Sequence, residues 1–321
     1  MITGLDHVVM LVNDIGAAAT AYQTLFGCAL AWRSAGDGAD RVLFTFDNMT
    51  LELMSPKGFS VAADRIRAVI AEQGEGLASI CFRTGDIAKM HRRLDRLALK
   101  PEPITDAESR DAASGATLSW KRTRAATEAT RGVRLFFLEM TKERPHSVPS
   151  ADAPITAMDH VVVSSADPER AAALYGARLG LDMALDRSHP DWGRLMFFRC
   201  GDLIVEVVHR PDANADKDKL WGLSWRVADI DATRARLASA GIDVSDVRTG
   251  PQAGDACAHR AQRHLRHSHA AGGANGADLS CAFPVIARGK ATKQSRHRRT
   301  IVDCFAEPVV GRAFARPVGS Q

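Results

Sequence analysis

An internal repeat constrains the fold of this chain more than any other feature of the sequence. The segment Leu5–Gly27 returns 153 residues later as Met158–Gly180, and the two copies share nine residues at one constant offset. In the first copy the shared residues are Asp6, His7, Val8, Val9, Asp14, Ala18, Ala19, Tyr22 and Gly27. A repeat of this quality predicts that one structural unit occurs more than once in the chain.

Each copy has the pattern of a strand followed by a capped helix. A Val-rich apolar run predicts a buried strand, after which Asp14 or Asp167 stands at the N-cap, where a carboxylate accepts hydrogen bonds from the free amides of the first turn. In the second copy Pro168 follows at the first helical position, where its missing N–H costs nothing. Gly27 is then expected to end the first helix.

Other segments repeat the same plan. Residues 41–54 and 194–208 each predict a hairpin whose second strand carries a glutamate, Glu52 or Glu206. A further strand and capped helix are predicted at 78–97 and again at 223–237. The chain therefore divides into four units, at residues 1–56, 77–140, 157–210 and from 221 onward. Because one such unit cannot cover both faces of its sheet, the units are expected to pair into two domains.

Composition limits the class of protein. The 321 residues are 45% apolar and 25% charged, which is typical of globular domains, and no apolar run reaches membrane-spanning length. Six cysteines without an export signal predict a cytoplasmic protein. The net charge of +4 arises after Gly254, since residues 1–254 carry −3, which argues against nucleic-acid binding. We expect a small-molecule partner, and the sequence is compatible with a homo-oligomer.

The Asp-His-Val-Val start of each copy and the strands ending in Leu-x-Glu or Ile-x-Glu resemble the vicinal oxygen chelate superfamily, which includes glyoxalase I, extradiol dioxygenases and bleomycin-resistance proteins. Tandem glyoxalase-like proteins are the most similar group. The resemblance implies an α+β fold of four βαβββ units paired into two glyoxalase-like domains, the fourth unit being incomplete. The predicted boundaries are residues 1–145, a linker at 146–156, and a truncated second domain at 157–254.

The resemblance also implies a divalent metal ion, Zn, Mn, Fe or Ni, held in the first domain by His7, Glu52 and Glu139. Ser79 stands where the family commonly has a second histidine. One imidazole and two carboxylates suit these ions and leave open positions for two adjacent oxygens of a substrate. Glu139 is predicted to be either the third ligand or the catalytic base that moves a proton next to those oxygens.

A second, weaker metal site is predicted in the other domain, where His160 and Glu206 repeat the first pair but Gly222 has no side chain that could bind a metal. The predicted function is a glyoxalase-like metal-dependent enzyme of the lyase, isomerase or dioxygenase type. Two alternatives stay open. In the first, these histidines and glutamates are structural residues. In the second, the protein is a metal-free small-molecule binder of the bleomycin-resistance type.

Trp120 and the basic residues Lys121, Arg122 and Arg124 lie together on a predicted hairpin whose first strand is residues 116–122. An aromatic side chain in this position can line a substrate cup, although it is more often part of a core. The basic residues are candidates for contacts with an anionic substrate, and a solvated outer face of the sheet is the alternative.

The segment 255–321 departs from the rest of the chain. Strand and helix periodicity ends after Gly254, and five of the eleven histidines follow. A disordered basic tail or a metal cluster would account for this composition; the cluster would use Cys257, His259, His264, His267 and His269. We favour a frameshifted translation. Residues 255–272 can be back-translated into codons that, when read one base later, encode a peptide with a strand-turn-strand pattern. The tail is then expected neither to pack as the fourth unit nor to bind metal.

Overall fold

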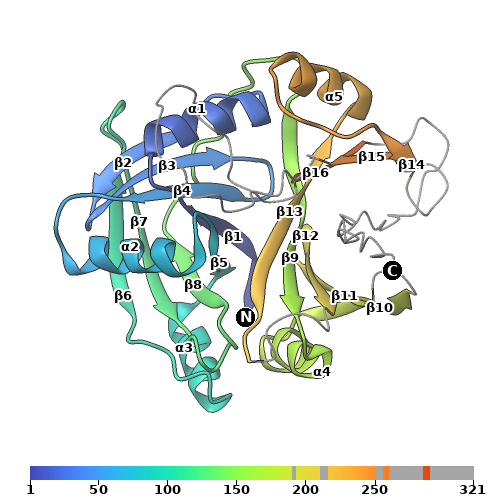
Figure 1. The fold of residues 1–321 in the computed structure, drawn as a ribbon. Coiled ribbons are helices and arrows are strands. Elements are labelled where there is room, and N and C mark those ends of the chain that lie inside the picture. Colours follow the sequence, from blue (N-terminus) through green and yellow to red (C-terminus); the bar gives the residue numbers. More distant parts are fainter. Residues whose placement is uncertain (190–192, 210–215, 250–255, 260–284, 290–321) are drawn as a thin grey trace, which may run out of the picture.

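The computed structural model describes residues 1–189, 193–209, 216–249, 256–259 and 285–289 (Figure 1). Two units build the first domain. The first unit contains β1 (Ile2–Leu11), α1 (Ile15–Phe26), β2 (Trp32–Gly36), β3 (Ala39–Thr45) and β4 (Thr50–Pro56). Helix α2 (Val61–Gln73) connects it to the second unit. The second unit contains β5 (Gly76–Thr84), α3 (Ile87–Arg96), β6 (Thr105–Arg110), β7 (Thr117–Arg124) and β8 (Arg134–Met140).

The second domain repeats this plan beside the first. Its first unit contains β9 (Ile155–Ser165), α4 (Pro168–Ala172), the π-helix η1 (Ala173–Arg178), β10 (Asp182–His189), β11 (Gly193–Cys200) and β12 (Leu203–His209). Its second unit contains β13 (Lys219–Val227), α5 (Ile230–Ser239), β14 (Arg248–Thr249), β15 (Ala256–His259) and β16 (Val285–Gly289). The four-unit α+β fold expected from the repeat is confirmed.

Each domain is one eight-stranded sheet with the same strand order. The orders are β2-β3-β4-β1-β5-β8-β7-β6 and β10-β11-β12-β9-β13-β16-β15-β14. The opening strands of two units pair antiparallel at the centre, as β1 does with β5, and each opening strand pairs parallel with the last strand of its own unit. The central strands of the first domain therefore bring together residues that lie far apart in the sequence.

Four helices begin at the N-cap residues that the local sequence predicts. The Asp14 carboxylate accepts from the amides of Gly16 and Ala17 at 2.8 and 2.9 Å, and Asp86, Asp167 and Asp229 cap three further helices in the same way. Gly27 ends α1 with a φ of +67°, in the left-handed region that a side chain disfavours.

The two sheets share one hydrophobic core on the faces that carry the helices. Alternate residues of β1, such as Val8 and Met10, point into this core, and Phe26 of α1 contacts Trp225 of the other domain at 4.8 Å between ring centroids. His7 and Val9 point to the opposite, concave face, which α2 partly covers (Figure 1). One face of the first sheet thus builds stability, and the other is left to form a site.

The fourth unit is present in a reduced form. Its last three strands have two, four and five residues, against six, eight and seven in the matching strands of the first domain. The expectation that nothing beyond residue 254 packs as this unit is wrong for the described residues, because β16 pairs parallel with β13, Leu223 opposite Val285. Pairing at the open edge of β13 uses backbone amides and carbonyls, so a segment can pair there without a regular pattern of apolar and polar side chains. The rest of the tail, and the side chains of the proposed metal cluster, lie outside the described residues.

Within the described part of the chain, no helix is both long and apolar enough to cross a membrane.

Candidate functional site

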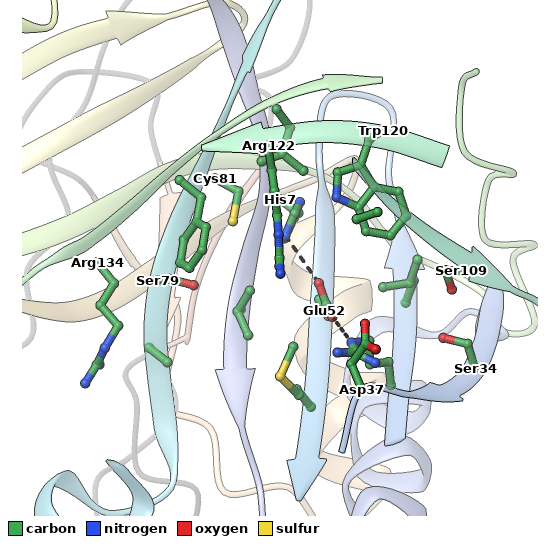
Figure 2. Close-up of a pocket in the computed structure, with 18 of the residues that line it drawn as sticks. His7, Ser34, Asp37, Glu52, Ser79, Cys81, Ser109, Trp120, Arg122 and Arg134 are labelled. Carbon is green, nitrogen blue, oxygen red and sulfur yellow. Dashed lines mark ion pairs between the residues drawn. The ribbon is translucent and has the colours of Figure 1, made fainter. Parts of the chain in front are cut away.

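A cavity of about 280 Å³ lies on the concave face of the first sheet (Figure 2). Strands β1, β4 and β5 form its floor, β7 and β8 form one wall, and Ile66 and Val69 of α2 close it from above. The lining is mixed, since apolar side chains such as Val9, Leu43 and Phe136 alternate with charged ones. This combination of an apolar wall and a few convergent polar groups is typical of small-molecule sites.

His7 and Glu52 meet on the cavity floor. His7 Nε2 lies 3.2 Å from Glu52 Oε2, and the other carboxylate oxygen of Glu52 lies 3.3 Å from Nε of Arg41. On the opposite side of the ring, His7 Nδ1 lies 2.7 Å from Asp6 Oδ1. The imidazole is therefore fixed between two carboxylates, and both of its nitrogens are oriented.

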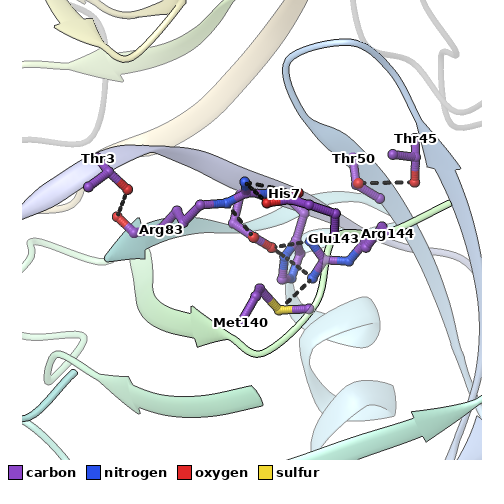
Figure 3. A network of polar contacts seen from close by, with 9 residues as sticks. Thr3, His7, Thr45, Thr50, Arg83, Met140, Glu143 and Arg144 are labelled. Atoms are coloured by element: carbon purple, nitrogen blue, oxygen red, sulfur yellow. Dashed lines mark hydrogen bonds and ion pairs between the residues drawn. The ribbon is translucent and has the colours of Figure 1, made fainter. Parts of the chain in front are cut away.

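A β-bulge places Asp6 beside the imidazole. Leu5 is opposite Phe82 and His7 is opposite Cys81, so Asp6 is an extra residue on β1 with no partner of its own on β5. Such a bulge changes the direction of a side chain. Asp6 is fully buried, and two arginines from different segments compensate its charge, Arg144 at 2.6 Å and Arg83 at 3.2 Å (Figure 3).

This network shifts the pKa values of both Asp6 and His7. Burial by itself would raise the pKa of Asp6, but the bond to His7 and the charges of Arg144 and Arg83 hold it below its usual range. Burial lowers the pKa of His7, and the opposing effects of Cys81 and Asp6 outweigh it and raise the pKa to about 10. The network thus favours the protonated form of His7, which is held against a carboxylate on the cavity floor.

Glu139 does not join His7 and Glu52, so the prediction that the three side chains share a cup is wrong. Its Oε2 accepts from the Ile87 amide at 2.7 Å, at the start of α3. Strand side chains alternate between faces, and β8 directs Phe136 and Leu138 into the cavity, which leaves Glu139 on the helix face. The prediction assigned the wrong residue of β8 to the position that matches Glu52. Val9 pairs with Glu52 and Cys81 pairs with Phe136, so by register Phe136 occupies the position that matches Glu52.

Ser79 lines the cavity as expected, and Trp120 and Arg122 do so as well (Figure 2). Three further residues of the site were not predicted from the sequence: Arg41, Arg144 and Cys81. Arg144 could not be found because it reaches the site from a distant segment, and Cys81 because nothing local links it to His7. Arg41 lies on the predicted hairpin beside Glu52, but its role was not recognised. The alternation of apolar and polar residues in β5 was the only signal for Cys81.

The second domain repeats the polar pair without the same surroundings. His160 Nε2 lies 2.9 Å from Glu206 Oε2, and Asp159 contacts both His160, at 3.0 Å, and Arg226, at 2.9 Å. Glu206 is aligned with Phe197, where Glu52 is aligned with Leu43. Phe197 belongs to an apolar cluster with Val162, Leu195 and Val208 that lies on this face of the sheet. The pair is therefore packed among apolar side chains.

Family profiles match both halves of the chain. A profile described as "Glyoxalase-like domain" matches residues 5–158, and one described as "Glyoxalase/Bleomycin resistance protein/Dioxygenase superfamily" matches residues 159–259. The chain is a tandem member of this superfamily. No curated protein sequence matches it.

Solved structures share the fold of this chain. A triple mutant of 4-hydroxymandelate synthase from Streptomyces coelicolor is 13% identical with a TM-score of 0.61, over 92% of this chain and 95% of that chain. A catechol 2,3-dioxygenase is 13% identical with a TM-score of 0.55, over 96% and 95%. A hypothetical protein from Staphylococcus aureus is 11% identical with a TM-score of 0.54, over 70% and 91%. Identities this low establish the fold alone.

The described side chains of this superfamily member do not form a complete metal site. Within the residues that the structure describes, no three His, Cys, Asp or Glu side chains are grouped closely enough to hold an ion. His7 and Glu52 provide two donors, while Ser79 and Phe136 occupy the positions related to them by the repeat. Catalytic zinc sites use three protein ligands, so the first domain lacks at least one. In the described part of the second domain, His160 and Glu206 are the matching donors, and Gly222 has no side chain.

Proposed function

We propose that the first domain binds one small organic molecule in its cavity and acts on it with its own side chains, without a resident metal ion. The observation that supports this most is the oriented pair of His7 and Glu52, whose nitrogen and oxygen lie 3.2 Å apart on the floor of a cavity of about 280 Å³. The cavity lies just below the usual range of ligand pockets, which is roughly 300–1,000 Å³.

The pair has two complementary roles. His7 is held in place by Asp6 and carries a proton at neutral pH, so Nε2 donates a hydrogen bond to a ligand oxygen and stabilises negative charge on it. Glu52 is held by Arg41 and accepts a proton from the ligand. This arrangement suits the movement of a proton next to a carbonyl or hydroxyl group.

A metal-dependent reaction, which the sequence favoured, is the competing proposal. It requires His7 and Glu52 to turn from each other toward a shared ion and a third donor to reach them. Glu139 is not available for this, because it accepts from the backbone of α3. The donor set therefore favours the metal-free proposal.

Metal analysis of untagged protein separates the two proposals. We expect well under one equivalent of Zn, Mn, Fe or Ni per chain after incubation with each ion and dialysis. The double variant Ser79→His with Phe136→Glu supplies the two missing donors and serves as a positive control that gains an ion. One equivalent in the wild type, lost in His7→Gln but kept in His160→Gln, would overturn the metal-free proposal.

A further inference from the structure

The charged residues that line the cavity are predominantly basic. Six arginines contribute to the lining, against three carboxylates, Asp37, Glu52 and Glu108. The arginines are Arg41, Arg65, Arg122, Arg124, Arg134 and Arg144. Clefts lined by one sign of charge concentrate ligands of the opposite sign.

Three of these arginines form a continuous arginine strip, Arg122, Arg124 and Arg134, along the wall built by β7 and β8. Arg122 and Arg124 are two residues apart on β7 and so point to the same face. Arg124 pairs with Phe136, which makes Arg134 its diagonal neighbour on β8. Arg122 lies near Trp120 at the wall, and Arg134 lies toward the opposite end (Figure 2).

The strip carries more positive charge than the protein neutralises. Arg41 and Arg144 on the floor are paired with Glu52 and Asp6, and Arg124 contacts Glu102 at 2.5 Å. Neither Arg122 nor Arg134 forms an ion pair with any residue in the described ranges.

The surroundings of Arg134 disfavour its positive charge. Burial and then the neighbouring charge of Arg124 lower its pKa, while Glu72 on α2 acts in the opposite direction. A bound anion would offset both the burial and the repulsion. The strip therefore has an electrostatic reason to bind a negative group.

Apolar side chains extend from the strip to the polar pair. Phe136 lies between Cys81 and Arg124 in the register of the sheet, and Cys81 is opposite His7. Trp120 and Leu138 continue the same wall. A ligand whose anionic end contacts the strip thus places a flat apolar body over Phe136 and its other end at His7 and Glu52.

We infer that the ligand is a small organic carboxylate with a flat apolar body, bound through its carboxylate to the arginine strip. This rests on the proposed function of the cavity as a ligand site. The guanidinium fork matches a carboxylate in geometry, and the cavity volume suits a molecule of about one ring rather than a nucleotide.

Cys81 lines the cavity and reports on it chemically. Iodoacetate and iodoacetamide are small, transfer nearly the same group to a thiol, and differ in charge. We measure the alkylation rate of Cys81 with each reagent by peptide mass spectrometry, and divide their ratio by the ratio for free glutathione. The expected preference for iodoacetate is about tenfold. It is lost in Arg122→Gln and Arg134→Gln and kept in Arg134→Lys.

Lys121→Gln is the matched control, because Lys121 lies on the same strand as Arg122 but points to the other face, opposite Glu139 of β8, so the substitution removes the same charge from outside the cavity. Thermal unfolding confirms that each variant is folded. Equal normalised rates for the two reagents, or an equal loss in Lys121→Gln, would overturn the carboxylate inference and leave the cavity function intact. Failure of both reagents to reach Cys81 in the folded protein would overturn the ligand site itself.

Discussion

The two domains share a motif and differ in what surrounds it. Asp6, His7 and Glu52 in the first domain correspond to Asp159, His160 and Glu206 in the second, and the histidine–glutamate distances are 3.2 and 2.9 Å. Around Glu52 the neighbouring strand presents Arg41 and Leu43, whereas around Glu206 it presents Leu195 and Phe197. The motif residues are the same, but only in the first domain do the histidine and the glutamate, His7 and Glu52, line the cavity described above.

The difference shows that a repeated polar pair does not by itself define a site. Exposure falls from 9% at Glu52 to 1% at Glu206, and Glu206 Oε1 has no hydrogen-bond partner within the described ranges. A buried ion pair in apolar surroundings is costly to break but does not meet a ligand. We therefore expect the pair in the second domain to act on stability and the pair in the first domain to act on ligands.

The largest expected effect is on stability. Glu206→Ala leaves the His160 imidazole without its closest charged partner in an apolar cluster, and loss of one partner of a buried pair costs about 3–5 kcal/mol. Glu52→Ala is expected to cost about 1–2 kcal/mol, because water can enter the cavity. Denaturant unfolding measures both changes. Equal losses would mean that the surroundings of the two pairs do not matter.

The next effect depends on pH. Folding raises the pKa of His7 from the ordinary value of 6.5 to about 10, so its contribution to stability is complete below pH 6.5 and is lost as the pH rises through 10. The free energy of unfolding should fall by up to a few kcal/mol across that range. His7→Gln should flatten the fall, and His91→Gln on α3 should preserve it. If the free energy of unfolding of His7→Gln falls with pH as steeply as that of the wild type, the assignment of this pH dependence to His7 is contradicted.

A smaller effect tests the role of Glu139. Glu139→Ala removes the acceptor for the Ile87 amide at the start of α3 and should cost about 1 kcal/mol, as for other lost caps. Alkylation of Cys81 and the metal content should not change. Glu143→Ala, which removes an exposed partner of Arg83, is the control and should have a smaller effect. Loss of a bound ion in Glu139→Ala would restore the role predicted from the sequence.

Local signals in the sequence predicted the fold well. The repeat gave the four units, and Asp14, Asp86 and Gly27 marked helix ends through hydrogen bonds and backbone angles that depend on a few neighbouring residues. His7 and Glu52 were also found, because both lie on central strands that the repeat itself aligns. Helix α2 was missed, although it covers the cavity.

The sequence did not show which side chains of a strand point into the cavity, nor which residues far apart in the chain are in contact. In β8 the core face and the cavity face are both largely apolar, so alternation did not decide whether Phe136 or Glu139 points inward. A shift of one residue reverses the answer. Arg144 lies 137 residues from His7 in the chain, and only the folded structure brings them together.

One measurement tests the contrast between the domains most directly. Cys81 lies opposite His7, and Ser224 lies opposite His160 at the matching position. In the Ser224→Cys variant both domains carry a thiol at this position, and iodoacetamide reports whether each can be reached. We predict that Cys81 is alkylated in the folded protein, whereas the introduced thiol reacts only after unfolding. Equal alkylation of the two thiols, or protection of Cys81 alone, would contradict the account.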